Sequence, residues 1–478
     1  MEHLPSWIPV VYLIAAVSFV LGLKGLSGPT TAVLGNRIAA AGMLLAVAAT
    51  FFDVQYREYG QTGLLLTVGG MLVGGVAGVA GGRLVKMTAM PQMVALFNGA
   101  GGGSAALVSI LEYTHSIGTV EGPTPGAVLS VVLGLMIGAV SFSGSAIAFG
   151  KLQGIVTPRA FRYPLQRPVT GALFVAMLAL AGMLIAAAGF GVQALPVETA
   201  LVGLTVLALV FGVALVMPIG GADMPVVISL LNAYTGLAVA AAGFVLGNQL
   251  LIVAGTLVGA SGTILTRLMS RAMNRSLGNV LFGAFGAATT ARASARTDDG
   301  RTVREVSAED AAILLQYAQE VIVVPGYGMA VAQAQHAVRQ LADLLGSKGV
   351  NVRYAIHPVA GRMPGHMNVL LAEANVPYEK LFDMEQINDD FKNADVALVI
   401  GANDVTNPAA RTDTGSPIYG MPILNVDQAK NVIVIKRSMK PGFAGIDNDL
   451  YLDPKTGMLF GDAKAAVERV IQEMKRAA

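Results

Sequence analysis

Val321-Ile-Val-Val-Pro-Gly-Tyr-Gly-Met-Ala-Val331 decides the fold of the second half of the chain. Its first four residues are apolar and β-branched, which predicts a short buried strand. A glycine turn follows at once, and a helical pattern then continues to about Leu345. This order is typical of a dinucleotide-binding turn, in which glycine lets the backbone approach a pyrophosphate and the helix N-terminus supplies unpaired N–H groups.

Apolar runs and helical stretches alternate through the rest of this half. The further predicted strands and helices are Val350–Ile356, Asn368–Ala374, Val396–Ile400, Val432–Ile435 and Ala463–Lys475. Such alternation predicts a doubly wound parallel sheet, so we expect an α/β Rossmann-like domain over residues 306–478. Ligands bind such sheets outside the carboxyl ends of the strands.

Glycine and polar residues gather in the loops at those strand ends: 360–365, 401–405 and 436–442. An NAD site would place an acidic residue at the end of the second strand, for the ribose hydroxyls, but this strand ends at Ile356-His357. Lys436, Arg437 and Ser438 can instead hold a 2′-phosphate by charge-assisted hydrogen bonds. NADP is therefore preferred over NAD, although a Lys-Arg pair after a strand is more often only a solvated surface.

The composition excludes several classes of protein. Hydrophobic residues make up 54% of the chain and charged residues 13%, which indicates a membrane protein. The net charge of +2 gives no reason to expect nucleic acid. With no cysteine there is no disulfide or thiolate metal site, and we expect no metal; redox chemistry must use a bound cofactor.

Nine apolar stretches before residue 270 are long enough to span a bilayer, which takes roughly 20 residues. We expect a membrane domain over residues 1–269 and a partly helical linker over 270–305. The first stretch is interpreted as a span and not as a removable signal, because no basic leader precedes it. The predicted spans are Ile8–Leu23, Ile38–Phe52, Leu64–Gly82, Met93–Tyr113, Val128–Gly150, Val169–Phe190, Thr199–Met217, Val226–Leu246 and Leu250–Thr266.

Basic residues predict the orientation of these spans. The connections after even-numbered spans carry only Arg57, and all other basic residues between spans follow odd-numbered ones. Basic connections face the cytoplasm, so we expect the N-terminus outside and the C-terminal domain inside, where nucleotide cofactors are found. The basic residues of the odd connections are Lys24, Arg37, Arg83, Lys86, Lys151, Arg159, Arg162, Arg167, Arg267, Arg271 and Arg275.

No predicted span has an ionisable residue near its middle, so this chain has no obvious proton carrier of its own. Most neutral polar residues there are interpreted as interhelical hydrogen-bonding groups, and the many glycines as helix contacts. Asn98 and Asn232 are the exceptions that we favour as part of a proton pathway, together with Ser261. Asp223 follows the seventh span and is either a solvated loop carboxylate or a gate at the mouth of that pathway.

Long motifs in both halves resemble the beta subunit of proton-translocating NAD(P) transhydrogenases. Together they cover nearly the whole chain. They are Met87-Thr-Ala-Met-Pro-Gln92, Gly220-Gly-Ala-Asp-Met-Pro225, Leu231-Asn-Ala-Tyr-Thr-Gly236, Ala272-Met-Asn-Arg-Ser276, Pro325–Val331, His357-Pro-Val-Ala-Gly-Arg-Met-Pro-Gly365, Asn368–Ala374, Gly401-Ala-Asn-Asp404, Val432–Ser438 and Gly461-Asp-Ala-Lys464.

The resemblance implies roles for individual residues. Asn403 and Asp404 would lie by the nicotinamide and take part in coupling, and they are the predicted catalytic residues. The loop from Gly442 would act as a lid, but Phe443 stands where members of the family often have tyrosine, which removes a hydroxyl contact. The predicted NADP(H)-binding residues are Gly326, Tyr327, Gly328, Met329, Ala330, Val331, Ala360, Gly361, Arg362 and Met363 around the pyrophosphate, Lys436, Arg437 and Ser438 at the 2′-phosphate, and Gly401, Ala402, Asn403, Asp404, Gly442, Phe443, Ala444, Asp447 and Asn448.

The resemblance also implies a reaction and partners: hydride transfer between NAD(H) and NADP(H), coupled to proton movement across a bacterial inner membrane. Only one dinucleotide fold is visible, so NAD(H) would lie on a soluble alpha subunit. Some members carry a membrane histidine where Asn98 stands, so a small membrane alpha subunit would supply the protonatable residue here, in a dimer of the complex. The alternatives are a channel or transporter gated by an NADP-sensing domain and a self-contained membrane dehydrogenase.

Overall fold

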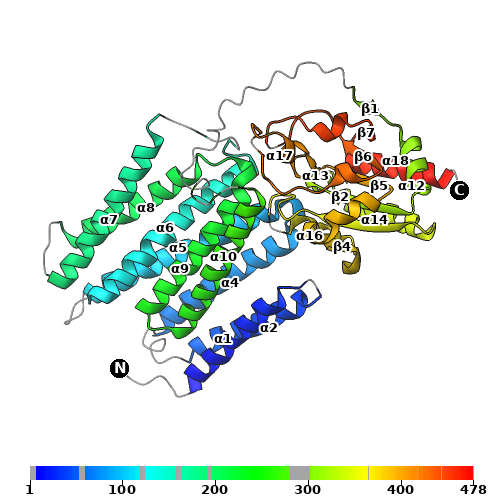
Figure 1. Cartoon of the computed structure of the whole chain (residues 1–478). Coiled ribbons are helices and arrows are strands. Elements are labelled where there is room, and N and C mark those ends of the chain that lie inside the picture. The colour runs from blue at the N-terminus through cyan, green and yellow to red at the C-terminus, as the bar shows by residue number, and fades with distance from the viewer. Residues whose placement is uncertain are drawn as a thin grey trace. The chain divides into compact units, whose positions relative to one another are not determined.

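The structure is a computed structural model of the chain, and it describes all residues except 1–6, 29, 53–59, 118–123, 158–160, 162–163, 191–194, 275, 277, 279–301, 364, 417, 443 and 477–478. The chain divides into two compact units, Met1–Thr266 and Arg267–Ala478 (Figure 1). Most of the predicted linker lies outside the described residues.

The described part of the first unit contains nine helices that are long and apolar enough to cross a membrane. All nine predicted spans are confirmed, and the second begins six residues earlier than predicted. The helices are α1 (Trp7–Gly25), α2 (Ala32–Thr50), α4 (Gly60–Leu84), α5 (Met90–Ile117), α6 (Pro125–Gln153), α7 (Gln166–Phe190), α8 (Val197–Val216), α9 (Met224–Val245) and α10 (Gln249–Ala272), with short 3-10 turns η1 (Met87–Ala89) and η2 (Gly221–Asp223).

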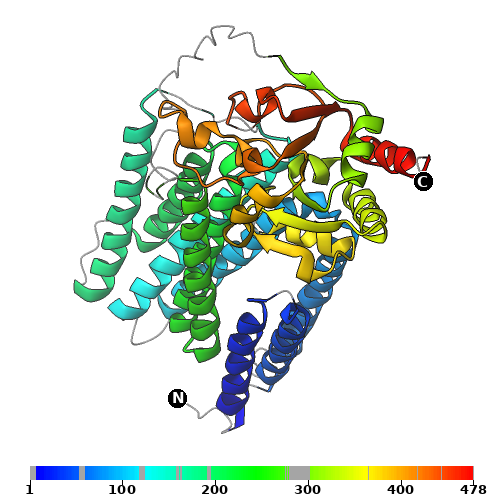
Figure 2. The ribbon, with the colours of Figure 1, turned by 45° about the vertical axis from the view of Figure 1, so that its right-hand side comes forward.

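Helices α5, α6 and α9 pack on one another, α8 packs on α6, and α1 and α2 form a hairpin (Figure 2). Glycines allow the closest approaches. A Cβ added at Gly138 of α6 would lie 2.6 Å from the Gly102 carbonyl oxygen of α5, and one at Gly236 of α9 would lie 2.5 Å from the Gly259 nitrogen of α10. The interpretation of glycines as helix contacts is confirmed at these positions.

For most of the glycines of α4 the same interpretation stays a prediction, because no described atom of this chain lies against them. Added Cβ atoms on six of them meet no described atom within 4 Å, whereas one at Gly81 would lie 3.1 Å from the Phe97 ring. The six are Gly69, Gly70, Gly74, Gly75, Gly78 and Gly82. The sequence could not show which glycines contact another helix, because a glycine pattern does not indicate which helix packs beside it.

The second unit is built on a seven-stranded, all-parallel sheet in the order β1-β7-β6-β5-β2-β3-β4. From β2 onward this is the strand order 3-2-1-4-5-6 of dinucleotide-binding folds, and the predicted fold class is confirmed. The predicted strands are β2 (Glu320–Pro325), β3 (Asn351–Ile356), β5 (Val396–Ile400) and β6 (Asn431–Lys436). Three further strands were not predicted, because they are short or contain glycine: β1 (Arg304–Glu305), β4 (Leu381–Asp383) and β7 (Thr456–Phe460).

Helices and short turns connect the strands. Ser307 caps α12 by accepting a hydrogen bond from the Asp310 backbone N–H. Helix α18 packs on α12 and α14. The helices are α12 (Ala308–Gln316), α13 (Tyr327–Val331), α14 (Gln335–Ser347), α15 (His366–Glu373), α16 (Met384–Ile387), α17 (Ala409–Thr412) and α18 (Ala463–Arg476), and the 3-10 turns are η3 (Tyr378–Lys380), η4 (Asn388–Asn393), η5 (Asp404–Thr406), η6 (Val426–Gln428) and η7 (Asp449–Leu452).

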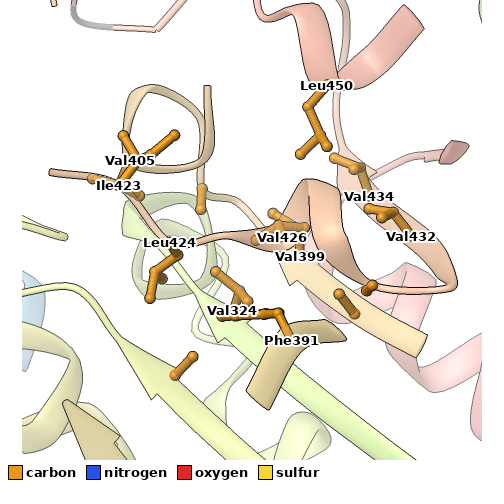
Figure 3. Packing of buried hydrophobic residues seen from close by; sticks show 14 of the residues in the cluster. Val324, Phe391, Val399, Val405, Ile423, Leu424, Val426, Val432, Val434 and Leu450 are labelled. Carbon is orange, nitrogen blue, oxygen red and sulfur yellow. The ribbon is translucent and has the colours of Figure 1, made fainter. Parts of the chain in front are cut away.

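A hydrophobic core lies against one face of this sheet (Figure 3). Val324, Val399 and Val434 enter it from the central strands β2, β5 and β6. Each is completely buried, so each stabilises the fold by roughly 1.5–3 kcal/mol relative to an exposed side chain. The core therefore holds the three central strands in fixed register beneath the loops at their carboxyl ends.

The prediction of a single long helix after the glycine turn is wrong. Helix α13 has five residues and α14 begins only at Gln335. Between them Gln333 adopts a positive φ of 51°, which breaks the helix. The apolar pattern continued through the break and concealed it.

Candidate functional site

Two glycine turns meet at the centre of the sheet, after the neighbouring strands β2 and β5. The Gly326 N–H donates to the Ile400 carbonyl at 2.9 Å, and the Gly328 N–H donates to the Gly401 carbonyl at 2.9 Å. A Cβ at Gly326 would lie 2.4 Å from the Ala402 Cα, and one at Gly401, whose φ is +66°, would lie 2.4 Å from the Gly328 Cα. These glycines are required by contact between the two loops.

This arrangement corrects one expectation about the glycine turn. We expected unpaired N–H groups at the start of a long helix, but α13 is too short for a substantial dipole, and the N–H groups of Gly326 and Gly328 already have protein acceptors. Any approach of a pyrophosphate to Gly326–Val331 remains a prediction. Within this turn Met329 and Ala330 are fully buried and Val331 is 45% exposed.

The loop 360–365 lies beyond β3 and next to the glycine turn. The Arg362 guanidinium stacks over the Tyr327 ring at 4.6 Å, so it brings a cation to the turn. Gly361 has a φ of +115°, and a Cβ there would lie 2.5 Å from His366 Nδ1. Ala360 is buried and Met363 half-buried.

Two buried histidines hold this loop in place. His366 Nδ1 accepts from the Arg362 N–H at 3.0 Å, and His357 Nε2 lies 2.8 Å from the Pro422 carbonyl oxygen. Burial lowers the pKa of His357 to about 4, and burial followed by the Arg362 charge lowers the pKa of His366 to about 4. Both rings are therefore neutral at pH 7, and His366 cannot act as a cation there.

Asn403 and Asp404 follow β5, and both form hydrogen bonds to residues of the predicted lid, which begins at Gly442. Asp404 Oδ2 accepts from the Ala444 N–H at 3.0 Å. Asn448 is 2% exposed, and its Nδ2 donates to the Asn403 carbonyl at 3.0 Å and to Asn403 Oδ1 at 3.1 Å. Asn403, Asp404, Ala444 and Asn448 therefore lie together, and a Cβ at Gly442 would lie 2.7 Å from Asp404 Oδ1.

Lys436 follows β6 and is half-buried, and its Nζ donates to the backbone carbonyls of Ser438 and Lys440. Burial lowers the pKa of Lys436, while the charges of Asp404 and Asp447 act in the opposite direction. Arg437 and Ser438 are exposed, as is Asp447. Phe443 lies outside the described residues.

In the membrane unit, Asn98 lies in a neutral polar cluster between α5, α6 and α9. Asn98 is 7% exposed, and its Nδ2 donates to Ser145 Oγ at 2.9 Å and to Ser141 Oγ at 3.3 Å. Ser141 Oγ lies 2.6 Å from Thr235 Oγ1 and donates to the Leu231 carbonyl. Asn98 Oδ1 has no hydrogen-bond partner among the described residues.

The other predicted pathway residues do not join this cluster. Asn232 is half-buried, and Ser261 donates to the Val258 carbonyl of its own helix at 3.2 Å. Asp223 is only 5% exposed, so the interpretation as a solvated loop carboxylate is wrong, because η2 and the start of α9 fold around it.

Lys151 was placed in the connection after the fifth predicted span, but it lies in the last turn of α6. It is 2% exposed, and its Nζ donates to the Met217 carbonyl at 2.5 Å and to the Ile219 carbonyl at 2.7 Å. Lys151 therefore caps the carbonyl end of α8.

Sequence reasoning missed three residues of the nucleotide-side loops: His366, Asn407 and Tyr451. Asn407 is fully buried, and its Nδ2 donates to the Asp447 carbonyl at 3.0 Å. The Tyr451 hydroxyl donates to Asn403 Oδ1 at 2.9 Å. His366 directly follows a recognised motif and Asn407 lies three residues after another, but nothing in the sequence around Tyr451 points to Asn403.

Comparison with known proteins agrees with this geometry. The family model of the NAD(P) transhydrogenase beta subunit matches residues 8–473. The chain belongs to the NAD(P) transhydrogenase beta subunit family. Two relatives named NAD(P) transhydrogenase subunit beta, from Rhodospirillum rubrum and from its strain ATCC 11170, are each 49% identical over 467 residues, which cover 97% of this chain and 98% of the relative.

Membership of the transhydrogenase beta subunit family settles the class of protein. The chain is a subunit of a membrane-bound oxidoreductase complex that uses nicotinamide nucleotides, and other subunits exist. Its apolar helices fit proton translocation, and its parallel-sheet unit fits NADP binding. Family membership therefore favours neither of the two alternatives, a channel or transporter without a reaction and a self-contained membrane dehydrogenase.

Proposed function

We propose that this beta subunit binds NADP(H), that a soluble alpha subunit brings NAD(H), and that hydride transfer between them is coupled to proton passage through the membrane unit. The observation that carries the proposal is the distribution of charge around the two glycine turns. Arg362 lies on the β3 side of these turns, Lys436 and Arg437 follow β6 on the other side, and β3 ends in a neutral histidine where an NAD site needs an acid.

The chain's own residues bind and orient the nucleotide. Arg362, with the turns Gly326–Val331 and Ala360–Met363, fits the pyrophosphate, and Lys436, Arg437 and Ser438 fit the 2′-phosphate, since cations and a hydroxyl form charge-assisted hydrogen bonds to phosphate. Asn403 and Asp404 orient the nicotinamide end, and the segment Gly442–Asn448 covers it. When bound, NADPH supplies the hydride, so the protein needs to supply position and not an acid or base.

Proton passage is assigned to Asn98, Asn232, Ser261 and Asp223, with a titratable group from a small membrane alpha subunit. Support comes from the cluster around Asn98, where a buried amide oxygen lacks a described donor and can accept from water or from a protonated partner group. One charge crossing the field is worth ~2.3 kcal/mol per 100 mV, and it can drive the soluble unit only if the coupled states differ in affinity for NADP⁺ and NADPH.

The proposal includes the placement of the complex. The membrane is the bacterial inner membrane, with the N-terminus outside and the nucleotide unit in the cytoplasm, as the basic connections favour. The functional divisions are the membrane domain 1–269, the linker 270–305 and the NADP(H)-binding domain 306–478, and the complex is a dimer.

Nucleotide binding to the purified complex tests the proposal. We expect NADPH to bind at least ~100-fold more tightly than NADH, because several charge-assisted hydrogen bonds of roughly 1.5–3 kcal/mol each depend on the 2′-phosphate. Arg437→Ala should remove much of this preference. Lys430→Ala, whose ammonium pairs with Asp395 at 2.8 Å, is the matched control and should keep it. Equal affinity of the unmodified complex for NADH and NADPH would contradict the proposal.

A further inference from the structure

Among the tyrosines that the structure describes, only Tyr451 has a hydroxyl that donates to a predicted catalytic residue. Its ring is 2% exposed in η7, far along the chain from β5. The hydroxyl donates to Asn403 Oδ1 at 2.9 Å and lies 3.2 Å from the Ala402 carbonyl oxygen. Because a hydroxyl has one proton, the shorter contact is the better hydrogen bond.

A second donor reaches the same amide oxygen. Asn448 Nδ2 lies 3.1 Å from Asn403 Oδ1, and Asn448 itself is fixed, because its Oδ1 accepts from the Leu450 N–H at 3.0 Å. An amide group turned by 180° would set its NH₂ against the Asn448 NH₂, and it would leave Tyr451 to donate only to the more distant Ala402 carbonyl. Asn448 therefore defines one orientation of the Asn403 side chain, and the Tyr451 hydroxyl makes its shorter hydrogen bond only in that orientation.

In that orientation the Asn403 NH₂ group faces Gly442, the first residue of the predicted lid. A Cβ at Gly442 would lie 2.7 Å from Asn403 Nδ2 and 2.7 Å from Asp404 Oδ1, so an amide donor and a carboxylate acceptor face the same side. Burial also raises the pKa of Tyr451, which keeps its proton available as a donor across the physiological range.

We propose that Tyr451 is a positioning residue, which holds the Asn403 amide so that its NH₂ group is presented to the nicotinamide half of NADP(H). This inference rests on the proposed function. It adds a requirement for the Tyr451 hydroxyl, which acts through Asn403 without touching the nucleotide.

The chain supplies a matched control for the loss of a buried hydroxyl. Tyr354 on β3 is completely buried, and its hydroxyl has no hydrogen-bond partner among the described residues. Tyr451→Phe and Tyr354→Phe thus remove the same atom from equally buried rings, and only the first removes a bond to Asn403.

The test is a mutant cycle in the purified complex with its partner subunits. Dissociation constants are measured for NADPH and for 2′-phospho-ADP-ribose, which lacks the nicotinamide. We expect Tyr451→Phe to weaken NADPH binding by roughly 3- to 10-fold, the value of one neutral hydrogen bond, and to leave the fragment unaffected. In an Asn403→Ala background, Tyr451→Phe should have no further effect on NADPH, because coupled residues are not additive. Tyr354→Phe should change neither constant.

An equal loss of NADPH binding in both backgrounds, an equal loss for the fragment, or no loss at all would overturn the role of Tyr451. These outcomes leave the NADP(H) site itself intact if the unmodified complex still prefers NADPH. Failure of the unmodified complex to prefer NADPH would overturn the site and this inference together.

Discussion

Asn98 in the membrane unit and Asn403 in the soluble unit have opposite hydrogen-bonding patterns. Asn98 uses its NH₂ group on Ser141 and Ser145, and its Oδ1 lacks a partner among the described residues. Asn403 uses its Oδ1 on Tyr451 and Asn448, and its NH₂ group faces Gly442. The membrane cluster thus leaves an acceptor open and the soluble cluster leaves a donor open, which suits a proton donor in one and a nucleotide oxygen in the other.

The largest effect that we expect is on NADPH affinity, and it comes from a substitution at Gly401 in the soluble unit. Gly401→Ala places a Cβ 2.4 Å from the Gly328 Cα at a positive φ of 66°, so both sterics and conformation oppose it. We expect NADPH affinity of the complex to fall by more than ~100-fold, from strain and overpacking of several kcal/mol. Gly346→Ala on α14, where a Cβ meets no described atom within 4 Å, should leave the affinity unchanged. Retained affinity in Gly401→Ala would contradict the loop contact.

Asp404→Asn is expected to have the next largest effect. It removes the charge that accepts the Ala444 N–H and faces Lys436, and charge-assisted hydrogen bonds are worth roughly 1.5–3 kcal/mol. We expect proton-coupled transhydrogenation in proteoliposomes to fall by ~10- to 100-fold while the protein still folds. Asp427→Asn, which breaks the ion pair with Arg411, controls for the loss of a carboxylate on the soluble unit. Unchanged coupled activity in Asp404→Asn would count against its role.

Asn98→Leu tests the open acceptor in the membrane. It removes the amide and its hydrogen bonds to two serines, each worth up to ~2 kcal/mol, and we expect coupled proton movement to slow by roughly 10-fold. NADPH binding to the complex should remain. Ser130→Ala, which removes only a bond to the Gly126 carbonyl of its own helix α6, should slow proton movement much less. A similar loss in both variants would mean that the cluster around Asn98 has no special part.

The smallest predicted effect is a pH dependence of the nucleotide loops. His366 has a pKa of about 4 in the folded chain, below an unfolded value of 6.5, so the unfolded chain binds more protons between these values. Its stabilising contribution is complete above pH 6.5 and is lost as the pH falls toward 4. From pH 7 to 5.5 the loss is about 1 kcal/mol.

Hydrogen exchange of the β2 and β3 amides in the intact complex at these two pH values measures this loss. His366→Gln should reduce the dependence by this amount and leave the part that arises from His357, whose pKa is also about 4, while a substitution of the exposed His336 controls for the change of residue. An identical pH dependence with and without His366 would show that the loss arises elsewhere.

Periodicity and motif spacing were enough to predict the membrane spans and the central strands, since each is a long apolar run with a clear period. Contacts between distant segments could not be predicted. The break at Gln333 lies inside a continuous apolar pattern. Asp223 and Lys151 were placed in connections between the predicted spans, and the structure shows that both side chains are buried. Tyr451 reaches Asn403 only because η7 folds back against the loop after β5, which no local pattern encodes.

The response of nucleotide affinity to a proton gradient tests the coupling of the two units most directly. The complex is reconstituted in proteoliposomes with its nucleotide sites outward, and the dissociation constant of NADPH is measured with and without an imposed gradient. We expect a gradient equivalent to 100 mV to shift the constant by up to ~50-fold per coupled charge, and Asn98→Leu to slow the approach to this shifted value by roughly 10-fold. The same constant with and without the gradient in the unmodified complex would contradict the account.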